Sequence, residues 1–370
     1  MILISGMFSR PKTAVFFAKA LLLLSFLSPA AAAAEMVELP PVLMQMLRND
    51  PVFEQLKLTD AERERVTGVL DRVDGQWWRS RIMQDAERID TVRRLTQEVK
   101  DELRQFLSPK AFSRLLQLER QALGTRMFLL DDVAADLTLS SITMDKMRAI
   151  AVEIDGKASE IQKRAQAGEH SEQVEAEKKE LAKRELSAIV GLLSNENKAR
   201  IKGLVGEPFD FSQVQRTYPR APELVAAPEH WLQGSPISLA ELRGNVVAVH
   251  FYAFQCINCQ RNLPHYSRWH ADYADQGLVV IGVQTPETSS EREPVRVAKA
   301  AEQERIEYPV LMDPESKNWQ AWGTTMWPTV YLVDRQGYIR AWWPGEMNWQ
   351  GKPGEQQMRT HIESLLNEPR

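Results

Sequence analysis

The feature that most constrains the fold is the run "NVVAVHFYAFQCINC", residues 245–259, which contains both cysteines of the chain, Cys256 and Cys259. Its first ten residues are continuously apolar, β-branched or aromatic, which predicts a strand buried on both faces. Residues 257–275 then have the pattern of a helix. Cys256 therefore lies where a buried strand ends and a helix begins. A strand of this kind is typical of a sheet covered by helices on both faces.

The chain after residue 225 continues to alternate between strand and helix patterns. Further strands are predicted at 277–285, 308–312, 329–334 and 338–343, and further helices at 291–304 and 355–367. Strands that alternate with helices and then end in a hairpin and a helix predict an α/β/α domain around a mixed central sheet.

Residues 41–206 have a different character, because they are rich in Glu, Lys, Arg, Leu and Ala and contain almost no strand pattern. Apolar residues recur at helical spacing over 80–106 and 144–191. Thr59 begins a capping box with the acid three residues later, and Ser108 precedes a proline that suits a first helical position. We therefore expect an all-helical domain in this half of the chain.

Two pairs of similar segments occur within the helical half. "LKLTDAERERV" (56–66) resembles "LTLSSITMDKM" (137–147), and "LSPKAFSRLLQL" (107–118) resembles "LSNENKARIKGL" (193–204). The repeat predicts two related helical hairpins. The Leu-Thr/Ser starts are similar to those of the LTxxQ-type modules of the periplasmic Spy/CpxP chaperones, although the glutamine is absent. This resemblance implies a chaperone-like or dimerising role; an ordinary helical bundle is the alternative.

The first residues have the pattern of a secretory signal peptide. Basic residues precede the apolar run 20–27, and the A-x-A pattern at 32–34 predicts a mature start at Glu35. The alternative is an uncleaved membrane anchor, although the apolar run is shorter than the roughly 20 residues that a spanning helix needs. No later stretch could span a bilayer. The predicted organisation is a signal peptide (1–34), a helical domain (41–206), a linker (207–224) and an α/β domain (225–370).

Charge and cysteine count narrow the function further. The net charge is -4, with acids and bases well mixed, which gives no electrostatic argument for nucleic-acid binding. A small exported protein stabilised by disulfides would contain several cysteine pairs, whereas this chain has one. A disulfide that closes so short a loop restricts the unfolded chain little, so structural stabilisation explains the pair poorly.

The Cys256–Cys259 pair could be a redox couple, half of a metal site, a haem attachment point or a coincidence. Zinc normally needs four ligands, and there is no second C-x-x-C and no paired histidine motif. Haem attachment requires a histidine where Gln260 stands. At a helix start the dipole and free amides favour a thiolate, and a cysteine one turn further in can form a disulfide with it. The context therefore favours a redox couple with an exposed attacker and a shielded resolver.

Residues 221–350 resemble the thioredoxin superfamily, in its exported TlpA/ResA-like branch. The motifs "APELVAAP…ISLAELRGNVVAVHFYAFQCINC", "GLVVIGVQTPE" and "YPVLMDPESKNWQAWGTTMWPTVYLVDRQGYIRAWWPGE" occur in the order of that branch. The C-I-N-C motif, "VIGVQTPE" and "WPT" are similar to the DipZ-type and NHL-repeat-associated redoxins. The resemblance implies a thioredoxin-like fold and an exported thiol–disulfide oxidoreductase that needs no cofactor and no metal.

The resemblance also implies roles for individual residues. Cys256 would attack the substrate and Cys259 would resolve the mixed disulfide. Pro328 stands where the family places a cis-proline opposite the cysteines. Trp327 and Thr329 flank that proline and would bind the substrate; packing alone is the alternative for Trp327.

The sequence departs from the family around the cysteines. Gln255 and Ile257 stand where Trp and Pro are common, and Asn262 stands where ResA-type proteins have a glutamate. His250 occupies the position of the buried acid of thioredoxin. We hypothesise that His250 accepts the proton of Cys259 when the mixed disulfide resolves, since an imidazole titrates near neutrality. A neutral histidine of the core is the alternative.

The expected partners are cysteine-containing exported proteins and a thiol electron donor or acceptor. The helical domain is a candidate dimer interface. An alternative function is a redox-sensing adaptor or chaperone-like protein whose helical domain binds clients. A peroxidase is less consistent, because the P-x-x-x-T/S-x-x-C pattern is absent. These motifs do not encode the direction of electron flow, which depends on the redox potential.

Overall fold

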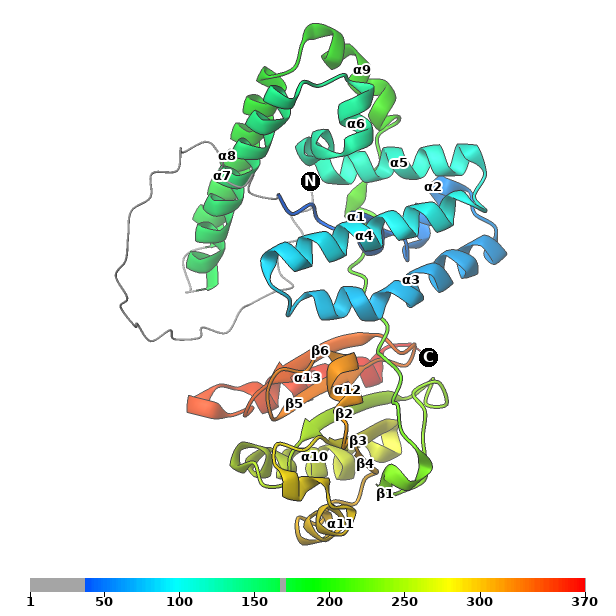
Figure 1. Cartoon of the computed structure of the whole chain (residues 1–370), viewed down its shortest axis with the longest axis vertical. Helices are drawn as coiled ribbons and strands as arrows, with labels where there is room; N and C mark the ends of the chain where they lie inside the picture. The colour runs from blue at the N-terminus through cyan, green and yellow to red at the C-terminus, as the bar shows by residue number, and fades with distance from the viewer. Residues whose placement is uncertain (1–36, 167–170, 370) are drawn as a thin grey trace, which may run out of the picture. The chain divides into compact units, whose positions relative to one another are not determined.

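The structure is a computed structural model that describes residues 37–166 and 171–369, so the predicted signal peptide (1–34) lies outside the described residues. The chain divides into two compact units (Figure 1). Within the described residues, the first unit consists of residues 37–67 and Asp85–Thr217. The second unit consists of Gly68–Gln84 and residues 218–369. The sequence had placed the segment 68–84 in the helical domain, whereas the structure groups it with the second unit.

The first unit is helical. Its helices are α1 (Val42–Met46), α2 (Asp50–Leu56), the start of α3 (Asp60–Ser80), α4 (Asp85–Arg104), α5 (Pro109–Leu123), α6 (Asp131–Asp136), α7 (Ser141–Gln166), α8 (Ser171–Gly191) and α9 (Asn195–Val205). The pattern at 144–191 therefore corresponds to two helices, α7 and α8, which lie side by side (Figure 1). Leu123, Phe128, Val133, Met147 and Ile189 belong to one buried apolar cluster, which packs α5 and α6 against α7 and α8.

The repeated Leu-Thr/Ser segments are capped helix starts. The side-chain oxygens of Thr59, Ser108, Ser140 and Ser194 each accept a hydrogen bond from the backbone amide three residues later. Glu62 also accepts from the Thr59 amide, at 2.9 Å, which completes the predicted capping box. The two copies of the repeat therefore share one device, a hydroxyl that satisfies an otherwise unpaired amide of the first turn.

The second unit contains a mixed six-stranded sheet in its described part. The strands are β1 (Trp231–Gln233), β2 (Val246–Tyr252), β3 (Leu278–Gln284), β4 (Val310–Met312), β5 (Thr329–Val333) and β6 (Ile339–Pro344), in the order β1-β4-β3-β2-β5-β6. Strands β2, β3 and β4 are parallel to one another. Strand β1 pairs with β4, β5 pairs with β2, and β6 pairs with β5, all in antiparallel orientation. The predicted α/β domain with a mixed sheet is confirmed.

Helices cover both faces of this sheet. Side chains of α10 (Ile257–Tyr273), α11 (Pro294–Gln303) and α13 (Gly354–Asn367) share a buried cluster with Val246 and Ala248 of β2. The alternate residues of β2 point to the opposite face, where they pack with Trp322 of α12 (Lys317–Trp322). All seven residues of β2 are buried, as the sequence predicted for this strand.

Some elements differ from the prediction. Strand β1 and helix α12 have no counterpart among the predicted elements, and β4 begins at Val310 rather than at residue 308. The predicted helix at 291–304 begins at Pro294. The reason is the proline, because the residue before a proline is disfavoured in a helix, and Glu293 is extended with φ -91° and ψ 113°.

The segment Gly68–Gln84 belongs to the second unit through an aromatic contact. The indole Nε1 of Trp78 donates to the carbonyl of Trp322 at 2.8 Å, and the Trp78 ring meets Trp342 edge-to-face with centroids 5.0 Å apart. The Arg81 guanidinium lies 3.6 Å from the centroid of the Trp78 ring and donates to the carbonyl of Gly323 at 2.8 Å. Burial lowers the pKa of Arg81 to about 10. These contacts cover one face of the sheet domain with residues from much earlier in the chain.

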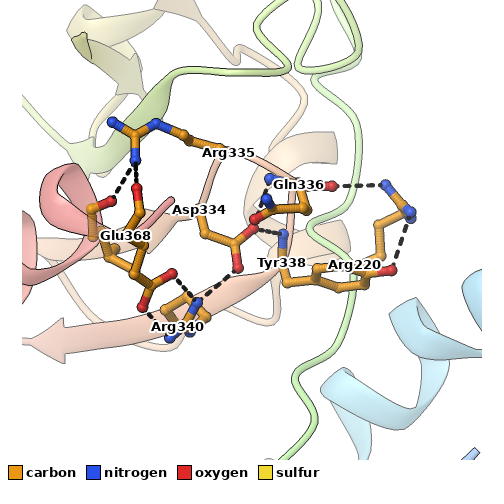
Figure 2. Close-up of polar contacts among 8 residues, drawn as sticks. Arg220, Asp334, Arg335, Gln336, Tyr338, Arg340 and Glu368 are labelled. Carbon is orange, nitrogen blue, oxygen red and sulfur yellow. Dashed lines mark hydrogen bonds and ion pairs between the residues drawn. The ribbon is translucent and has the colours of Figure 1, made fainter. Parts of the chain in front are cut away.

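A polar cluster closes the turn between β5 and β6 (Figure 2). Arg335 donates to the carbonyls of Leu365 and Glu368 at 2.9 and 2.6 Å, which satisfies acceptors at the end of α13. Arg340 forms ion pairs with Asp334 at 3.1 Å and with Glu368 at 2.7 Å. The cluster fixes α13 to the end of β5 that lies away from the cysteines.

Candidate functional site

The two cysteines lie at the start of α10. Cys256 is the N-cap residue of this helix, is half-buried, and accepts from the Gln260 amide at 3.0 Å through its carbonyl. Cys259 lies in the first turn and is only 1% exposed. Both are free thiols in this structure. The arrangement leaves Cys256 accessible to a large reactant and shields Cys259 from it.

The environment of Cys259 strongly favours the protonated thiol. Burial raises the pKa of Cys259 well above its usual value, and the neighbouring Cys256 acts in the same direction. A backbone hydrogen bond at Ala253 opposes this shift only in part. Cys259 therefore needs to lose a proton before it can act as a nucleophile.

The predicted proline lies in a loop held by several hydrogen bonds. The Trp327–Pro328 peptide bond is cis, as the resemblance implies. The Trp327 indole donates to the carbonyl of Thr285 at 3.0 Å and stacks on Trp319 with centroids 4.1 Å apart. The carbonyl of Pro328 accepts from the Gly345 amide at 2.6 Å. The orientation of Trp327 is thus fixed on two sides while part of its ring stays exposed.

The two cysteines and Trp327 are parts of the same side of the sheet domain. Cys256 and Trp327 both pack against the buried cluster that contains Cys259. Thr329 is 2% exposed, and its hydroxyl donates to the carbonyl of Met326 at 2.8 Å. Its side chain therefore holds the proline loop, and a contact of Thr329 with substrate stays a prediction.

His250 lies on β2 inside a cluster of tyrosines. It is fully buried, stacks on Tyr266 with centroids 4.1 Å apart, and lies 5.1 and 5.4 Å from the ring centroids of Tyr252 and Tyr308. Burial lowers the pKa of His250 to about 3, so the ring is neutral near pH 7. This agrees with the core-histidine interpretation, and the role of His250 as proton acceptor for Cys259 stays a prediction.

Several polar atoms of this cluster lack partners within the described residues. They are both ring nitrogens of His250 and the hydroxyl of Tyr252. Burial raises the pKa values of Tyr252 and Tyr266, and charge on Cys259 would raise both further. Buried polar groups in proteins are generally hydrogen-bonded to protein or to ordered water. These tyrosines belong to the same buried cluster as the resolving cysteine, so the region beside it contains polar groups.

Asn262 joins α10 to the loop after β6. It is 1% exposed. Its Nδ2 donates to the Tyr266 hydroxyl at 3.2 Å and to the Gly345 carbonyl at 3.3 Å, while its Oδ1 accepts from the Met347 amide at 3.2 Å. The side chain thus fixes the segment that in turn holds the Pro328 carbonyl.

Glu291 is a buried residue of the site that the sequence did not single out. It is fully buried, and its carboxylate accepts from the backbone amides of Gln255, Glu287 and Thr288 at 2.8, 2.7 and 2.8 Å. The Gln255 side chain accepts in turn from the hydroxyls of Thr288 and Ser290 at 2.7 and 2.8 Å. The Thr-x-x-Glu spacing at 288–291 is a capping box and was the signal that could have drawn attention to it.

Two kinds of feature are absent from the part of the chain that the structure describes. Across 37–166 and 171–369, no three His, Cys, Asp or Glu side chains form a group that could hold a metal ion. No helix in those ranges has the length and apolar character needed to cross a bilayer.

A cysteine pair at the start of the helix after a central strand, together with a cis-proline before the neighbouring strand, defines a thioredoxin-like domain. Comparison with known families agrees, because residues 220–342 match the profile of the AhpC/TSA family. Residues 220–342, about a third of the chain, are therefore similar to that family.

Three known proteins are similar to parts of this chain, and one of them is named a thiol-disulfide oxidoreductase. Protein DipZ of Mycobacterium tuberculosis is 44% identical over 113 residues, which are 30% of this chain and 16% of DipZ. NHL repeat-containing protein 2 of Gallus gallus is 33% identical over 29% of this chain and 15% of its own length. The thiol-disulfide oxidoreductase ResA of Geobacillus thermodenitrificans is 26% identical over 36% of this chain and 71% of its own length. The matches confirm the predicted resemblance and support an oxidoreductase, although the chain spans only 16% of DipZ.

Proposed function

We propose that this chain is an exported thiol–disulfide oxidoreductase whose Cys256–Cys259 couple exchanges disulfides with protein substrates. The observation that carries the proposal is an accessible cysteine at the N-cap of α10 with a shielded cysteine in the first turn. The relative named thiol-disulfide oxidoreductase ResA supports the same chemistry.

In the reducing direction the exchange takes two steps. The Cys256 thiolate attacks one sulfur of a substrate disulfide, and the other substrate sulfur leaves as a thiolate. The Cys259 thiolate then attacks the Cys256 sulfur, which releases the second substrate thiolate and forms the Cys256–Cys259 disulfide. Two electrons pass to the substrate, and a thiol donor restores the couple. The oxidising direction is the reverse of these steps.

The second step requires Cys259 to lose its proton. Because burial raises the pKa of Cys259, this proton transfer is the demanding part of the step. We propose His250 as the acceptor, because neither nitrogen of its neutral ring has a partner in the described structure and one of them is free to bind a proton. With its pKa lowered to about 3, the ring would hold that proton only transiently before passing it on. With His250→Leu, a preformed mixed disulfide at Cys256 should resolve more slowly in single-turnover measurements. An unchanged rate of resolution would exclude His250 as the acceptor.

Trapping of the intermediate tests the proposed function on the full-length chain. The Cys259→Ser variant should accumulate a mixed disulfide with a protein substrate that contains a disulfide. The thiol that would resolve the bond at Cys256 is absent from this variant. Cys256→Ser should form none, since the remaining thiol is 1% exposed. Non-reducing gels and mass spectrometry distinguish the two. Equal trapping by both variants, or by neither, contradicts the proposed roles.

The redox potential would determine the direction of electron flow. A value near -120 mV would indicate an oxidant and one near or below about -270 mV a reductant.

We propose cysteine-containing exported proteins as substrates, with a thiol donor or acceptor as second partner. Export rests on the pattern of residues 1–34. Sequencing of the mature protein from the exported fraction should give Glu35 as the first residue, and an intact residue 1 would favour the anchored alternative.

A second candidate function is a redox-sensing adaptor whose helical unit binds clients. The observation in its favour is the first unit itself, since residues 85–217 lie outside the matched family profile. A chain with both cysteines changed to serine separates the two functions. If it still suppresses aggregation of an unfolded client as well as the wild type does, the helical unit has a binding role of its own.

A further inference from the structure

The loop between β3 and α11 contains a carboxylate that bridges two separate segments. Glu291 accepts the Gln255 amide through Oε1 and the amides of Glu287 and Thr288 through Oε2. Gln255 immediately precedes Cys256, whereas Glu287 and Thr288 belong to the loop of Glu291 itself. One side chain thus fastens the cysteine loop to a neighbouring loop.

The burial of this group points to more than capping of a short turn. A carboxylate removed from water is costly unless hydrogen bonds replace its hydration, and Glu291 is fully buried. Amide donors to a carboxylate are strong hydrogen bonds. A capping box needs only the contacts within 288–291 and could stand in solvent, so it does not account for the bond to Gln255.

The same loop also contacts the other half of the site. Its first residue, Thr285, accepts the indole hydrogen bond of Trp327 at 3.0 Å. Two of its hydroxyls, on Thr288 and Ser290, donate to the side chain of Gln255. The loop therefore joins the residue before Cys256 to the residue before the cis-proline.

We propose that Glu291 is a positioning residue for the Cys256–Cys259 couple. Its carboxylate holds the backbone next to Cys256 against the β3–α11 loop, and this sets how readily the two thiols form their disulfide. The proposal rests on the function proposed above. Glu291 does not contact substrate and takes no part in bond making.

Loss of this contact should favour the dithiol form. A glutamine at position 291 has one acceptor oxygen and one NH2 group, and the NH2 group cannot accept a hydrogen bond from a backbone amide. Either the Gln255 amide or the amides of Glu287 and Thr288 therefore lose their acceptor. A looser cysteine loop lowers the effective concentration of one thiol at the other, which disfavours the disulfide. The looser cysteine loop therefore makes the couple more oxidising.

The test is the equilibrium of the full-length chain with glutathione. Wild type, Glu291→Gln and Glu293→Gln are equilibrated in buffers of graded reduced and oxidised glutathione, and the disulfide fraction is read by thiol trapping and mass spectrometry. Glu293 is the matched control, because it is exposed and lies two residues further along the same loop. We expect the constant for Glu291→Gln to shift threefold to tenfold toward the dithiol, where tenfold corresponds to about 30 mV.

Unfolding midpoints of both redox forms separate positioning from stability. A purely structural role lowers the midpoints of the oxidised and reduced forms equally and leaves the glutathione constant unchanged, and that result overturns the proposal. An equal shift in Glu293→Gln would also overturn it. A wild-type chain that forms no Cys256–Cys259 disulfide in oxidised glutathione overturns the proposed function, and this inference with it.

A second variant covers the case in which Glu291→Gln does not fold. Gln255 is exposed, so Gln255→Ala should fold while removing the side-chain contacts to Thr288 and Ser290. It should shift the glutathione constant in the same direction by a smaller factor, about twofold. A shift toward the disulfide in Gln255→Ala contradicts the proposal.

Discussion

Single residues beneath the cysteine loop combine close packing with buried polarity. Gly282 of β3 lies under the ring of His250, and a Cβ there would stand 3.0 Å from Nε2 of His250 and 3.2 Å from Cε1 of Tyr252. The absent side chain of Gly282 thus makes room for two aromatic rings. Interiors packed to this density respond to the addition or removal of a single group.

The first prediction at this scale concerns pH. The pKa of His250 is about 3 in the folded protein, against about 6.5 for an unperturbed histidine. Below pH 6.5 the unfolded chain therefore binds a proton that the folded chain does not. The free energy of unfolding should fall as the pH falls from 6.5 toward 3, by at most about 1.4 kcal/mol per pH unit from this group.

Urea unfolding at pH 7 and pH 5 checks this expectation. Unfolding of the second unit is followed by the fraction of chains alkylated at both cysteines, because Cys259 is accessible only after unfolding. His250→Leu should reduce the loss of stability between the two pH values. His361→Gln, at an exposed position, is the control and should not. A pH dependence in His250→Leu equal to that of the wild type would contradict the assigned protonation.

The second prediction concerns Gly282. Gly282→Ala forces a methyl group against the rings of His250 and Tyr252, and overpacking of this kind costs about 1 to 3 kcal/mol of unfolding free energy. Double alkylation at increasing urea measures the loss. Gly75 in α3 belongs to the same unit and is the contrast, since only the Arg79 guanidinium lies within 4 Å of its Cβ position, at 3.8 Å, and alanine favours a helix. Equal stability of Gly282→Ala and wild type would contradict the close contact.

At the scale of helices and strands, most of the second unit could be predicted from the sequence. The apolar run that became β2 is unambiguous, because all its residues are buried and a strand buried on both faces has no polar alternation. The starts of α3 and α5 were predicted from Thr59 and Ser108, since capping depends on neighbours in sequence. Helix caps can therefore be predicted from sequence, because they depend only on residues that are close in the chain.

The cap at Ser108 gives a third prediction. Ser108→Ala leaves the Ala111 amide without its side-chain acceptor and should lower the unfolding free energy of the helical unit by about 1 kcal/mol. Thermal unfolding followed by circular dichroism at 222 nm measures it. Ser113→Ala, at an exposed position inside the same helix, should leave the midpoint unchanged or raise it slightly. A lower midpoint in the control than in Ser108→Ala would argue against a role for the cap.

The elements that escaped prediction depend on distant contacts. Strand β1 has three half-buried residues, too few to show a period. Helix α12 has six residues between Ser316 and Gly323, both in left-handed conformations that no local pattern announced. Glu291 stands in a run of charged residues that is typical of a solvated helix start. One of the contacts around the buried Glu291 comes from the cysteine loop between β2 and α10, whose Gln255 amide donates to its carboxylate.

At the scale of the whole molecule, the second unit is made of two pieces of chain. Residues 85–217 separate the segment 68–84 from the rest of the unit. Trp77 and Trp78 occur in a charged helical pattern, so nothing in the local sequence indicates that Trp78 packs on the sheet domain. A fragment that begins at residue 218 lacks this contact, which is why the tests above use the full chain.

The fourth prediction follows from this division. Trp78→Ala removes a side chain that is 3% exposed, together with its hydrogen bond to Trp322, and should cost about 3 to 5 kcal/mol in the unfolding of the second unit. Double alkylation of Cys256 and Cys259 at increasing urea reports on that unit. Ile82→Ala, at a position of the same segment that is 47% exposed, should change the midpoint little. Similar midpoints for the two variants would mean that 68–84 is not part of the unit.

The contact between Trp78 and Trp322 also sets an order of events during protein synthesis. The two residues are 244 positions apart, so at roughly 5 to 20 residues per second the ribosome needs roughly 10 to 50 seconds to make the second after the first. Throughout that interval Trp78 has no sheet domain to pack against. The second unit can therefore complete its fold only after Trp322 and the elements that follow it, through α13, have been translated.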